Sequence, residues 1–330
     1  MPFVPPTYYD QTTLAEQGIY QLPSACDLPT MDDRVPRAQC SQHAWCAKNG
    51  PLWLAPIVSS LLHSMILIDT SLTTPAENLA FDEAMLEVAD RDTETNLEHV
   101  IPEVLRLWEM PTPCVVLGRA SKWAEEANAI ACERDSVPIL RRVSGGASIV
   151  AGPGCLMYSV LLSYQIRPAW RMLDIAHSEV MTRMRQAVQN SLNSLNTPVQ
   201  IDLQGTCDLT LNNRKFSGNA LRCKRHWMLY HGTIMVAMPL EWITEYLLEP
   251  PRQPDYREKR VHSSFVANLM DGRIDAATSL EFKTLLQKRI AVAWNAAPIG
   301  TDTWFQQEVA EESARLMQSR YSDPLWHRQR

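Results

Sequence analysis

The sequence predicts an α+β domain in which mixed β-sheets are flanked by helices. Strand-like apolar runs and helical segments are interleaved after residue 65, without the regular β-α-β alternation of a doubly wound sheet. Residues 168–195 carry the one-sided apolar stripe of a helix that covers a sheet, with Leu173, Ala176, Val180, Met184, Ala187 and Val188 on the stripe. Two short apolar runs separated by Asn212-Asn213 predict a β-hairpin over residues 208–216.

The individual elements follow in a clear order. Residues 65–68 predict a strand, and Thr74, Pro75 and Glu77 supply the cap, the first-turn proline and the third-position glutamate of a helix that runs to about residue 90. Further strands are expected over residues 105–108, 114–117, 137–142, 156–164 and 229–236. Helices are expected over residues 122–133, 239–249, 282–295 and 303–321.

Composition and charge exclude several classes of protein. The chain has 330 residues, 45% of them hydrophobic, which is enough for one large core or two ordinary ones. Lysine and arginine (31) against aspartate and glutamate (37) give a net charge of −6, so no nucleic-acid partner is expected. The longest apolar run, residues 51–68, is interrupted by prolines and polar residues and predicts no membrane span. Eight cysteines without repeated CxxC pairs indicate a reducing, cytoplasmic setting.

Residues 1–64 contain eight of the 22 prolines and no sustained period. They predict a disordered and dispensable N-terminal extension, and one alternative is that translation starts at Met65. Cys40, His43 and Cys46 could form part of a zinc site, but the fourth ligand would have to come from Cys26 or elsewhere. Whether the chain binds a metal is therefore left open.

The first motif with chemical content is a glycine loop, residues 142–148, which follows the strand expected over residues 137–142. It holds Arg142, Ser144, Gly145, Gly146 and Ala147 directly after Arg141. Adjacent glycines let backbone amides approach an anion, and an arginine can pair with a phosphate or a carboxylate. The alternative is a plain turn with surface arginines.

The second motif is a lysine hairpin, residues 208–220. It begins at Asp208 and contains Lys215, Ser217, Gly218, Asn219 and Ala220, with His231-Gly232-Thr233 further along the chain. A lysine beside Ser-Gly-Asn can hold a carboxylate or phosphate oxygen on which charge develops. The alternative is an exposed hairpin lysine without a chemical role.

The two motifs in this order resemble the lipoate-protein ligase A family, within the superfamily of biotin/lipoate ligases and lipoyl/octanoyl transferases. The resemblance extends over most of residues 65–325. It also includes Asp69-Thr70, Asn78-Leu79-Ala80, Val116-Leu117-Gly118-Arg119 and residues 321–326.

The resemblance implies a biotin/lipoate protein ligase-like catalytic domain over residues 65–330. Such enzymes activate lipoate or octanoate with ATP and Mg²⁺ to an acyl-adenylate and pass the acyl group to a lysine of an acceptor domain. The implied acceptors are of the 2-oxoacid dehydrogenase E2 or glycine cleavage H protein type. By position, Lys215 would be catalytic and would contact the acyl carbonyl and phosphate. The implied substrate-binding and adenylate-binding residues are Arg142, Ser144, Gly145, Gly146, Ala147, Asp208, Ser217, Gly218, Ala220 and His231.

This chain also departs from the family pattern. Ala147 replaces the third glycine, and Ala151 replaces a histidine often found there. No C-terminal accessory domain is expected after the ligase-like core, so a separate accessory subunit is a candidate partner.

Two other functions are therefore retained. An acyltransferase would take octanoyl or lipoyl groups from a carrier protein and would use Cys155 or Cys207 as a nucleophile. A non-catalytic subunit or scaffold would bind lipoylated partners, although such a protein would not need the charge of Lys215. Basic residues in segments 222–226 and 252–260 could meet an acidic acceptor, and the alternative is that they form solvated loops.

Overall fold

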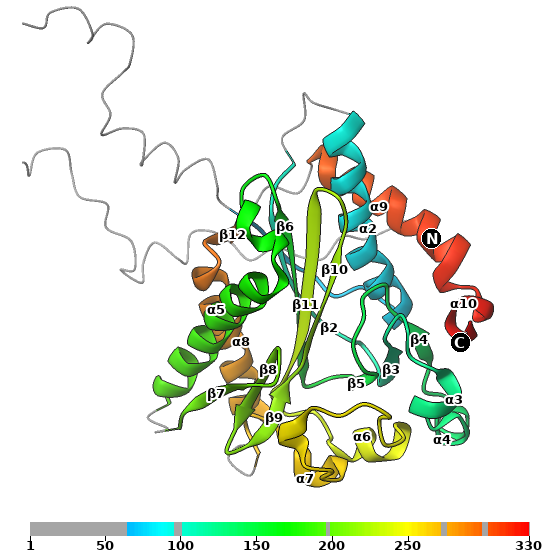
Figure 1. Ribbon diagram of the computed structural model, residues 1–330, viewed down its shortest axis with the longest axis vertical. Helices are drawn as coiled ribbons and strands as arrows, with labels where there is room; N and C mark the ends of the chain where they lie inside the picture. Colours follow the sequence, from blue (N-terminus) through cyan, green and yellow to red (C-terminus); the bar gives the residue numbers. More distant parts are fainter. Residues whose placement is uncertain (1–64, 96–100, 196–198, 272–275, 299–302, 330) are drawn as a thin grey trace, which may run out of the picture. The chain divides into compact units, whose positions relative to one another are not determined.

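The computed structural model describes residues 65–95, 101–195, 199–271, 276–298 and 303–329. The predicted extension over residues 1–64, including Cys40, His43 and Cys46, lies outside the described residues. In the described part of the chain, the predicted α+β arrangement of mixed sheets and flanking helices is confirmed (Figure 1).

A six-stranded mixed sheet forms the centre, with the strand order β10-β11-β6-β2-β1-β12. Strand β1 is parallel to β2 and β12, and the other neighbours are antiparallel. All nine residues of β6 are buried, as expected for a strand covered on both faces. The six strands are β1 (Met65–Asp69), β2 (Val104–Glu109), β6 (Cys155–Ser163), β10 (Asn219–Cys223), β11 (Trp227–Met235) and β12 (Ala296–Pro298).

Two three-stranded sheets carry the two motifs. In the first, β3 (Cys114–Leu117) lies between β4 (Ile139–Arg141) and β5 (Ile149–Ala151), so the glycine loop connects β4 to β5. In the second, β8 (Asp208–Leu211) lies between β7 (Ile201–Gln204) and β9 (Arg214–Ser217). The predicted hairpin is confirmed: Asn212 and Asn213 have φ values of 51° and 59°, typical of the two-residue turn that matches the strand twist.

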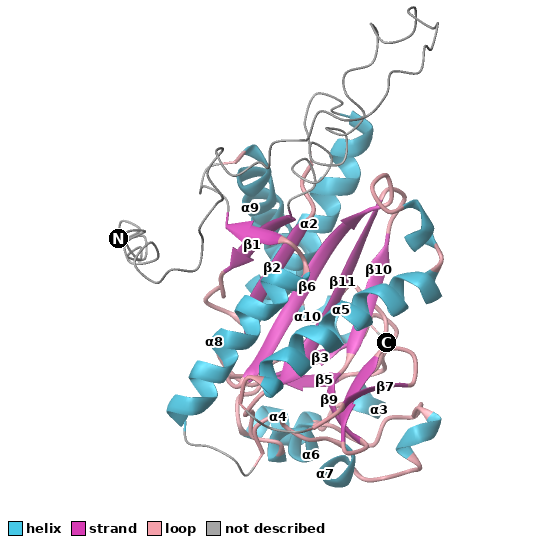
Figure 2. Cartoon of the chain, turned by 90° about the vertical axis from the view of Figure 1, so that its left-hand side faces the viewer, coloured by secondary structure: helices cyan, strands magenta, loops and turns pink. Residues whose placement is uncertain are grey.

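Four long helices cover the central sheet. Helices α2 (Pro75–Thr95) and α9 (Trp304–Leu316) pack together, as do α5 (Leu173–Asn193) and α8 (Ala276–Ala293). Figures 1 and 2 show the two pairs on opposite faces of the sheet. The short helices are α3 (Trp123–Glu126), α4 (Ala129–Arg134), α6 (Glu241–Tyr246), α7 (His262–Phe265) and α10 (Pro324–Arg328). Among the described residues, no helix combines the length and apolar character needed to cross a membrane.

Three expected helices differ in detail. The segment 122–133 forms two helices, because Ala127 is extended and the Asn128 side chain caps α4 by accepting from Ala131 N. The segment 168–195 begins with a 3-10 turn, and Leu173, expected on its buried stripe, is exposed. The segment 303–321 ends in a π-helical turn over Met317–Tyr321.

Candidate active site

Arg142 points inward and holds the glycine loop together. Its side chain donates to Ser144 Oγ at 2.9 Å and to the carbonyls of Val116, Gly145 and Ala147 at 3.2, 2.5 and 3.0 Å. Burial lowers the pKa of Arg142 to about 10. The loop is therefore folded around its own guanidinium group, which fixes the backbone between Ser144 and Ala147.

Crowding around the loop explains the glycines at positions 118 and 146. Gly146 has a φ of +88°, and a Cβ there would lie 2.9 Å from Arg142 Nη2. A Cβ on Gly118 would lie 2.0 Å from Gly146 O, so no larger residue fits at that crossing. Gly145, in contrast, has open space where a Cβ would be.

A buried hydrogen-bond chain runs beneath the loop. Ser144 Oγ lies 2.6 Å from His231 Nε2, and His231 Nδ1 lies 3.4 Å from Asp82 Oδ2. Because Arg142 Nε donates to Ser144 Oγ, the Ser144 hydroxyl can donate to His231 Nε2, which leaves the Nδ1 proton for Asp82. Ser144 is fully buried, so this Ser-His-Asp series positions the loop and does not present a nucleophile.

Asp82 connects this series of hydrogen bonds to Arg106 and Ser159. It accepts from Arg106 Nη1 at 2.7 Å and from Ser159 Oγ at 2.5 Å. Burial alone would raise the pKa of Asp82, but Arg106 and His231 outweigh it and hold the pKa below its usual value. The Arg106 guanidinium also lies 4.6 Å from the centre of the Trp108 ring, which lines a cavity of the site. Asp82 thus orients two residues that line that cavity, His231 directly and Trp108 through Arg106.

Lys215 lies on β9 and is partly exposed. Its Nζ is 2.8 Å from Asp208 Oδ1, and 27% of the side chain is accessible. A Cβ on Gly218 would lie 2.7 Å from Lys215 Nζ, so the glycine leaves room for the ammonium group. Only one of the three Nζ hydrogens is used by Asp208, and the other two can meet a ligand.

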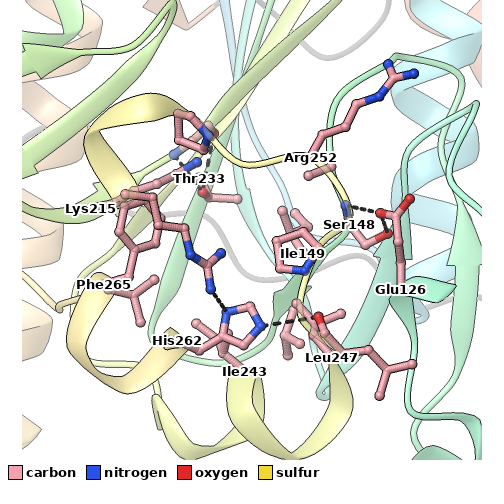
Figure 3. Close-up of a pocket in the computed structure, with 18 of the residues that line it drawn as sticks. Glu126, Ser148, Ile149, Lys215, Thr233, Ile243, Leu247, Arg252, His262 and Phe265 are labelled. Carbon is pink, nitrogen blue, oxygen red and sulfur yellow. Dashed lines mark hydrogen bonds between the residues drawn. The ribbon is translucent and has the colours of Figure 1, made fainter. Parts of the chain in front are cut away.

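Two cavities meet at Lys215. The lysine cavity spans about 810 Å³ including its open mouth, and Ile243 of α6 and Phe265 of α7 form part of its wall (Figure 3). The histidine cavity spans about 600 Å³, again including its open mouth, and is lined by His231 and by the apolar side chains of Leu79, Trp108, Val116 and Met157. The walls common to both are Ala147, Ser148, Ile149, Lys215, Gly218 and Thr233.

The structure thus brings most of the predicted site residues together. Those that line a cavity are Arg142, Gly146, Ala147, Lys215, Gly218, Ala220 and His231. Ser144 and Ser217 are fully buried and line neither cavity, and Gly145 is exposed outside both. Asp208 lies behind Lys215 and contacts it directly.

Asn219 belongs to the lysine motif but is not among the site residues that the resemblance implies. Its Nδ2 donates to Cys207 O at 2.6 Å, and its Oδ1 accepts from the Tyr158 hydroxyl. A Cβ on Gly232 would lie 1.7 Å from Asn219 Oδ1, which explains why glycine follows His231. Asn219 therefore links the lysine hairpin to β6 and β11.

Glu126 was also missed, because nothing in its local sequence marks it. Its Oε2 accepts from Ser121 Oγ at 2.9 Å and from Ser148 N and Oγ at 3.1 and 2.7 Å. Figure 3 shows Glu126 and Lys215 on opposite sides of the lysine cavity. Among the described residues, no three His, Cys, Asp or Glu side chains gather as metal ligands.

The two candidate nucleophilic thiols lie in unfavourable surroundings. Cys155 is fully buried on β6, and burial raises the pKa of its thiol to about 12. Burial likewise raises the pKa of Cys207 to about 11. Both thiols are therefore protonated at neutral pH, which is the opposite of an activated cysteine.

The two basic segments differ in their surroundings. Lys224 and Arg225 form ion pairs with Glu87 and Glu94 of α2, at the end of the β10–β11 hairpin remote from His231. In the segment 252–260, Arg252 lines the lysine cavity. The second segment is thus the one adjacent to the site.

Comparison with known proteins agrees with this arrangement. The sequence profile of the lipoyl protein ligase A/B catalytic domain matches residues 74–291, and the chain belongs to this family. It is 24% identical to lipoate–protein ligase 1 of Staphylococcus aureus over 67% of this chain and 61% of that protein, and 24% identical to LplJ of Bacillus subtilis over 68% and 62%. It is 26% identical to the octanoyltransferase LipM of Carboxydothermus hydrogenoformans over 78% and 96%. The chain thus spans less than two thirds of the length of both ligases.

Solved structures share the fold. A bi-partite lipoate protein ligase of Thermoplasma acidophilum aligns with a TM-score of 0.60 and 19% identity, over 81% of this chain and 96% of that one. A lipoate-protein ligase A solved with ATP gives 0.58 and 19% over 81% and 98%, and LipL1 of P. falciparum solved with lipoate gives 0.56 and 16% over 81% and 74%. The predicted lipoate ligase-like fold is confirmed.

Proposed function

We propose that this protein attaches a lipoyl or octanoyl group, through an acyl-adenylate, to a lysine of an acceptor domain. The observation that carries the proposal is Lys215, whose partly exposed ammonium group lies where two adjoining cavities meet. Two adjoining cavities suit a ligand with two chemically different halves. Family membership supports the same activity.

The acyl chain would occupy the histidine cavity, since Leu79, Trp108, Val116 and Met157 form apolar walls there. Burial of each CH₂ contributes about 0.8 kcal/mol, which favours an eight-carbon chain. The adenylate would occupy the lysine cavity. In this proposal Arg142 and Ser144 act by holding the glycine loop, and the backbone of Gly146 and Ala147 borders the ligand.

Transfer then needs a cation at the acyl carbonyl. The acceptor amine attacks the carbonyl carbon, a C–N bond forms, and the bond from that carbon to the phosphate oxygen breaks as AMP leaves with the electron pair. Negative charge grows on the carbonyl and phosphate oxygens, and the two free Nζ hydrogens of Lys215 would stabilise it. The amine proton passes to solvent or to phosphate.

ATP and Mg²⁺ would be needed to form the adenylate. Mg²⁺ in such sites is held mainly by phosphates and waters, with one or two carboxylates. Glu126, on the wall of the lysine cavity, is a carboxylate that fits this role. A structural neighbour solved with ATP supports nucleotide binding by this fold.

The proposed partners are lipoyl-acceptor domains of the E2 or H-protein type. One structural neighbour is described as a bi-partite ligase with its E2 lipoyl domain, which supports both an E2-type acceptor and a separate accessory subunit here. We further propose that residues 65–330 form the catalytic domain and that residues 1–64 are dispensable. The five cysteines of the described segments are free thiols, consistent with a reducing cytoplasmic setting.

An octanoyltransferase acting from a carrier protein is the second candidate, favoured by the match to LipM over nearly its whole length. The raised thiol pKa values of Cys155 and Cys207 disfavour it, because a thiolate must attack the carrier thioester. A non-catalytic scaffold is disfavoured by the exposed ammonium of Lys215.

Three donors offered in parallel separate these functions: free acid with ATP and Mg²⁺, preformed acyl-adenylate, and acyl-carrier protein. Mass spectrometry of the acceptor should show transfer from the adenylate and weaker transfer from free acid with ATP. Use of the carrier donor alone, lost in Cys155→Ser or Cys207→Ser, would establish the transferase. Inactivity with every donor, together with tight acceptor binding, would establish the scaffold.

A further inference from the structure

Tyr256 forms a hydrogen bond with Asp208, the carboxylate that pairs with Lys215. Its hydroxyl donates to Asp208 Oδ2 at 2.7 Å, while Oδ1 of the same carboxylate is 2.8 Å from Lys215 Nζ. The tyrosine comes from a different part of the chain, the 3-10 turn Asp255–Arg257. Both oxygens of Asp208 are thus held, each by a residue of a different element.

The Tyr256 ring is firmly seated. It lies against Phe265 of α7 with ring centres 5.4 Å apart, and Gly205, with a φ of +56°, also lies close to it. A Cβ on Gly205 would lie 3.3 Å from Tyr256 Cε1. The ring has little freedom to swing away from Asp208.

The backbone after Tyr256 adopts a costly conformation. Glu258 and Lys259 have φ values of 50° and 60°, a left-handed conformation that is unfavourable for residues other than glycine. Arg260 holds this turn by donating to Tyr256 O and to Asn213 O, both at 2.8 Å. The strained turn is therefore attached to the tip of the lysine hairpin.

The same segment borders the substrate space. Arg252, Pro254 and Arg257 line the lysine cavity, and we name residues 250–262 the cap segment. Arg257 is anchored to Glu249 at 2.7 Å. Tyr256 consequently connects a wall of the cavity to the ion pair that orients the lysine.

We propose that Tyr256 is a positioning residue for Lys215: through Asp208, it fixes the direction of the ammonium group relative to the reacting carbonyl. This inference rests on the proposed acyl transfer. With Oδ2 held by Tyr256, rotation of the carboxylate is restricted, Oδ1 stays on Lys215, and the two remaining Nζ hydrogens stay available where the cavities meet. Tyr256 itself need not contact the ligand.

The test compares Tyr256→Phe with Tyr246→Phe. Tyr246 of α6 is a matched control, because its hydroxyl also donates to a carboxylate, Asp135 Oδ2 at 3.1 Å, away from Lys215. With preformed acyl-adenylate, Tyr256→Phe should lower kcat about tenfold, as expected for loss of a hydrogen bond to a charged group, with little change in KM. Tyr246→Phe should leave both constants unchanged.

A double-mutant cycle tests the route through Asp208. In an Asp208→Ala background the tyrosine has no carboxylate to hold, so Tyr256→Phe should have no further effect on kcat. Additive effects, an unchanged kcat in Tyr256→Phe, or a change in KM alone would each overturn the inference while leaving acyl transfer established. A wild-type protein inactive with every donor would overturn the proposed function and the inference together.

Discussion

The glycine loop and the lysine hairpin use their positive charges in opposite ways. Arg142 is 6% exposed and directs its guanidinium at four groups of its own loop and the adjoining strand. Lys215 is 27% exposed on its side chain and keeps two of three hydrogens available at the junction of the cavities. Basic residues beside glycines look the same in a sequence. Only the hydrogen-bond acceptors around each one show whether it holds the backbone, as Arg142 does, or is available to a ligand, as Lys215 is.

Backbone geometry produces the difference. After β4 the chain turns around the Arg142 side chain, and Gly146 and Gly118 let two backbone segments nearly touch there. In the lysine hairpin the register shifts between Leu209 and Thr210, and Gly218 leaves space beside Lys215. The first motif closes on itself, whereas the second opens toward the cavities.

The largest expected effect is on stability, from Arg142→Ala. The substitution removes the buried guanidinium that donates to Ser144 Oγ and to the carbonyls of Val116, Gly145 and Ala147, so we expect a loss of about 3–5 kcal/mol in the free energy of unfolding. Urea unfolding measures it. A stable variant that has lost only activity would contradict the structural role of Arg142 in holding the glycine loop, and would indicate that Arg142 contacts the substrate.

Lys215→Ala should lower activity and leave stability nearly unchanged, in contrast to Arg142→Ala. Transfer should fall by a factor that corresponds to about 3 kcal/mol in the barrier or more, because the charge at the developing oxyanion is lost. The melting temperature should change little, since the side chain is partly exposed. A lipoylation gel-shift assay beside circular dichroism measures both, with the exposed Lys288→Ala as control. Retained activity would remove Lys215 from the mechanism.

Gly146→Ala and Gly145→Ala test whether the two glycines of the loop differ in their importance for stability. The first adds a Cβ at a φ of +88° and 2.9 Å from Arg142 Nη2, so we expect the free energy of unfolding to fall by about 1–3 kcal/mol. The second meets no atom within 4 Å and should change stability by less than about 1 kcal/mol. Thermal melts of the pair measure the difference, and equal losses would show that crowding around Arg142 does not fix the loop.

Local sequence patterns predicted the elements with strong periods. The predicted start of α2 is confirmed, with Thr74 and Glu77 exchanging hydrogen bonds, and α5 buries Ala176, Val180 and Met184 as expected. Strands β5, β7, β10 and β12 were missed. They are only three to five residues long, and every residue of β10 is half-buried, so no alternation marks it.

The site was predictable where a motif is contiguous, and not where it depends on distant partners. Lys215 and His231 could be selected from their neighbours in the chain. The pairing of Arg106 with Asp82 joins α2 to β2 inside the core, and no local pattern indicates which buried charges will meet. The inward direction of Arg142 likewise depends on acceptors from β3.

The smallest effect concerns pH and the strand that leads into the glycine loop. Arg141 N donates to His327 Nδ1 at 3.0 Å, and burial lowers the pKa of His327 below its usual value of 6.5. The folded state therefore favours the neutral ring, and the stability it contributes is present above pH 6.5 and is lost as the pH falls. Between pH 7 and pH 5 the wild type should lose more stability than His327→Gln, which cannot take up that proton. Equal losses, measured by urea unfolding at both pH values, would show that α10 does not secure the glycine loop through this histidine.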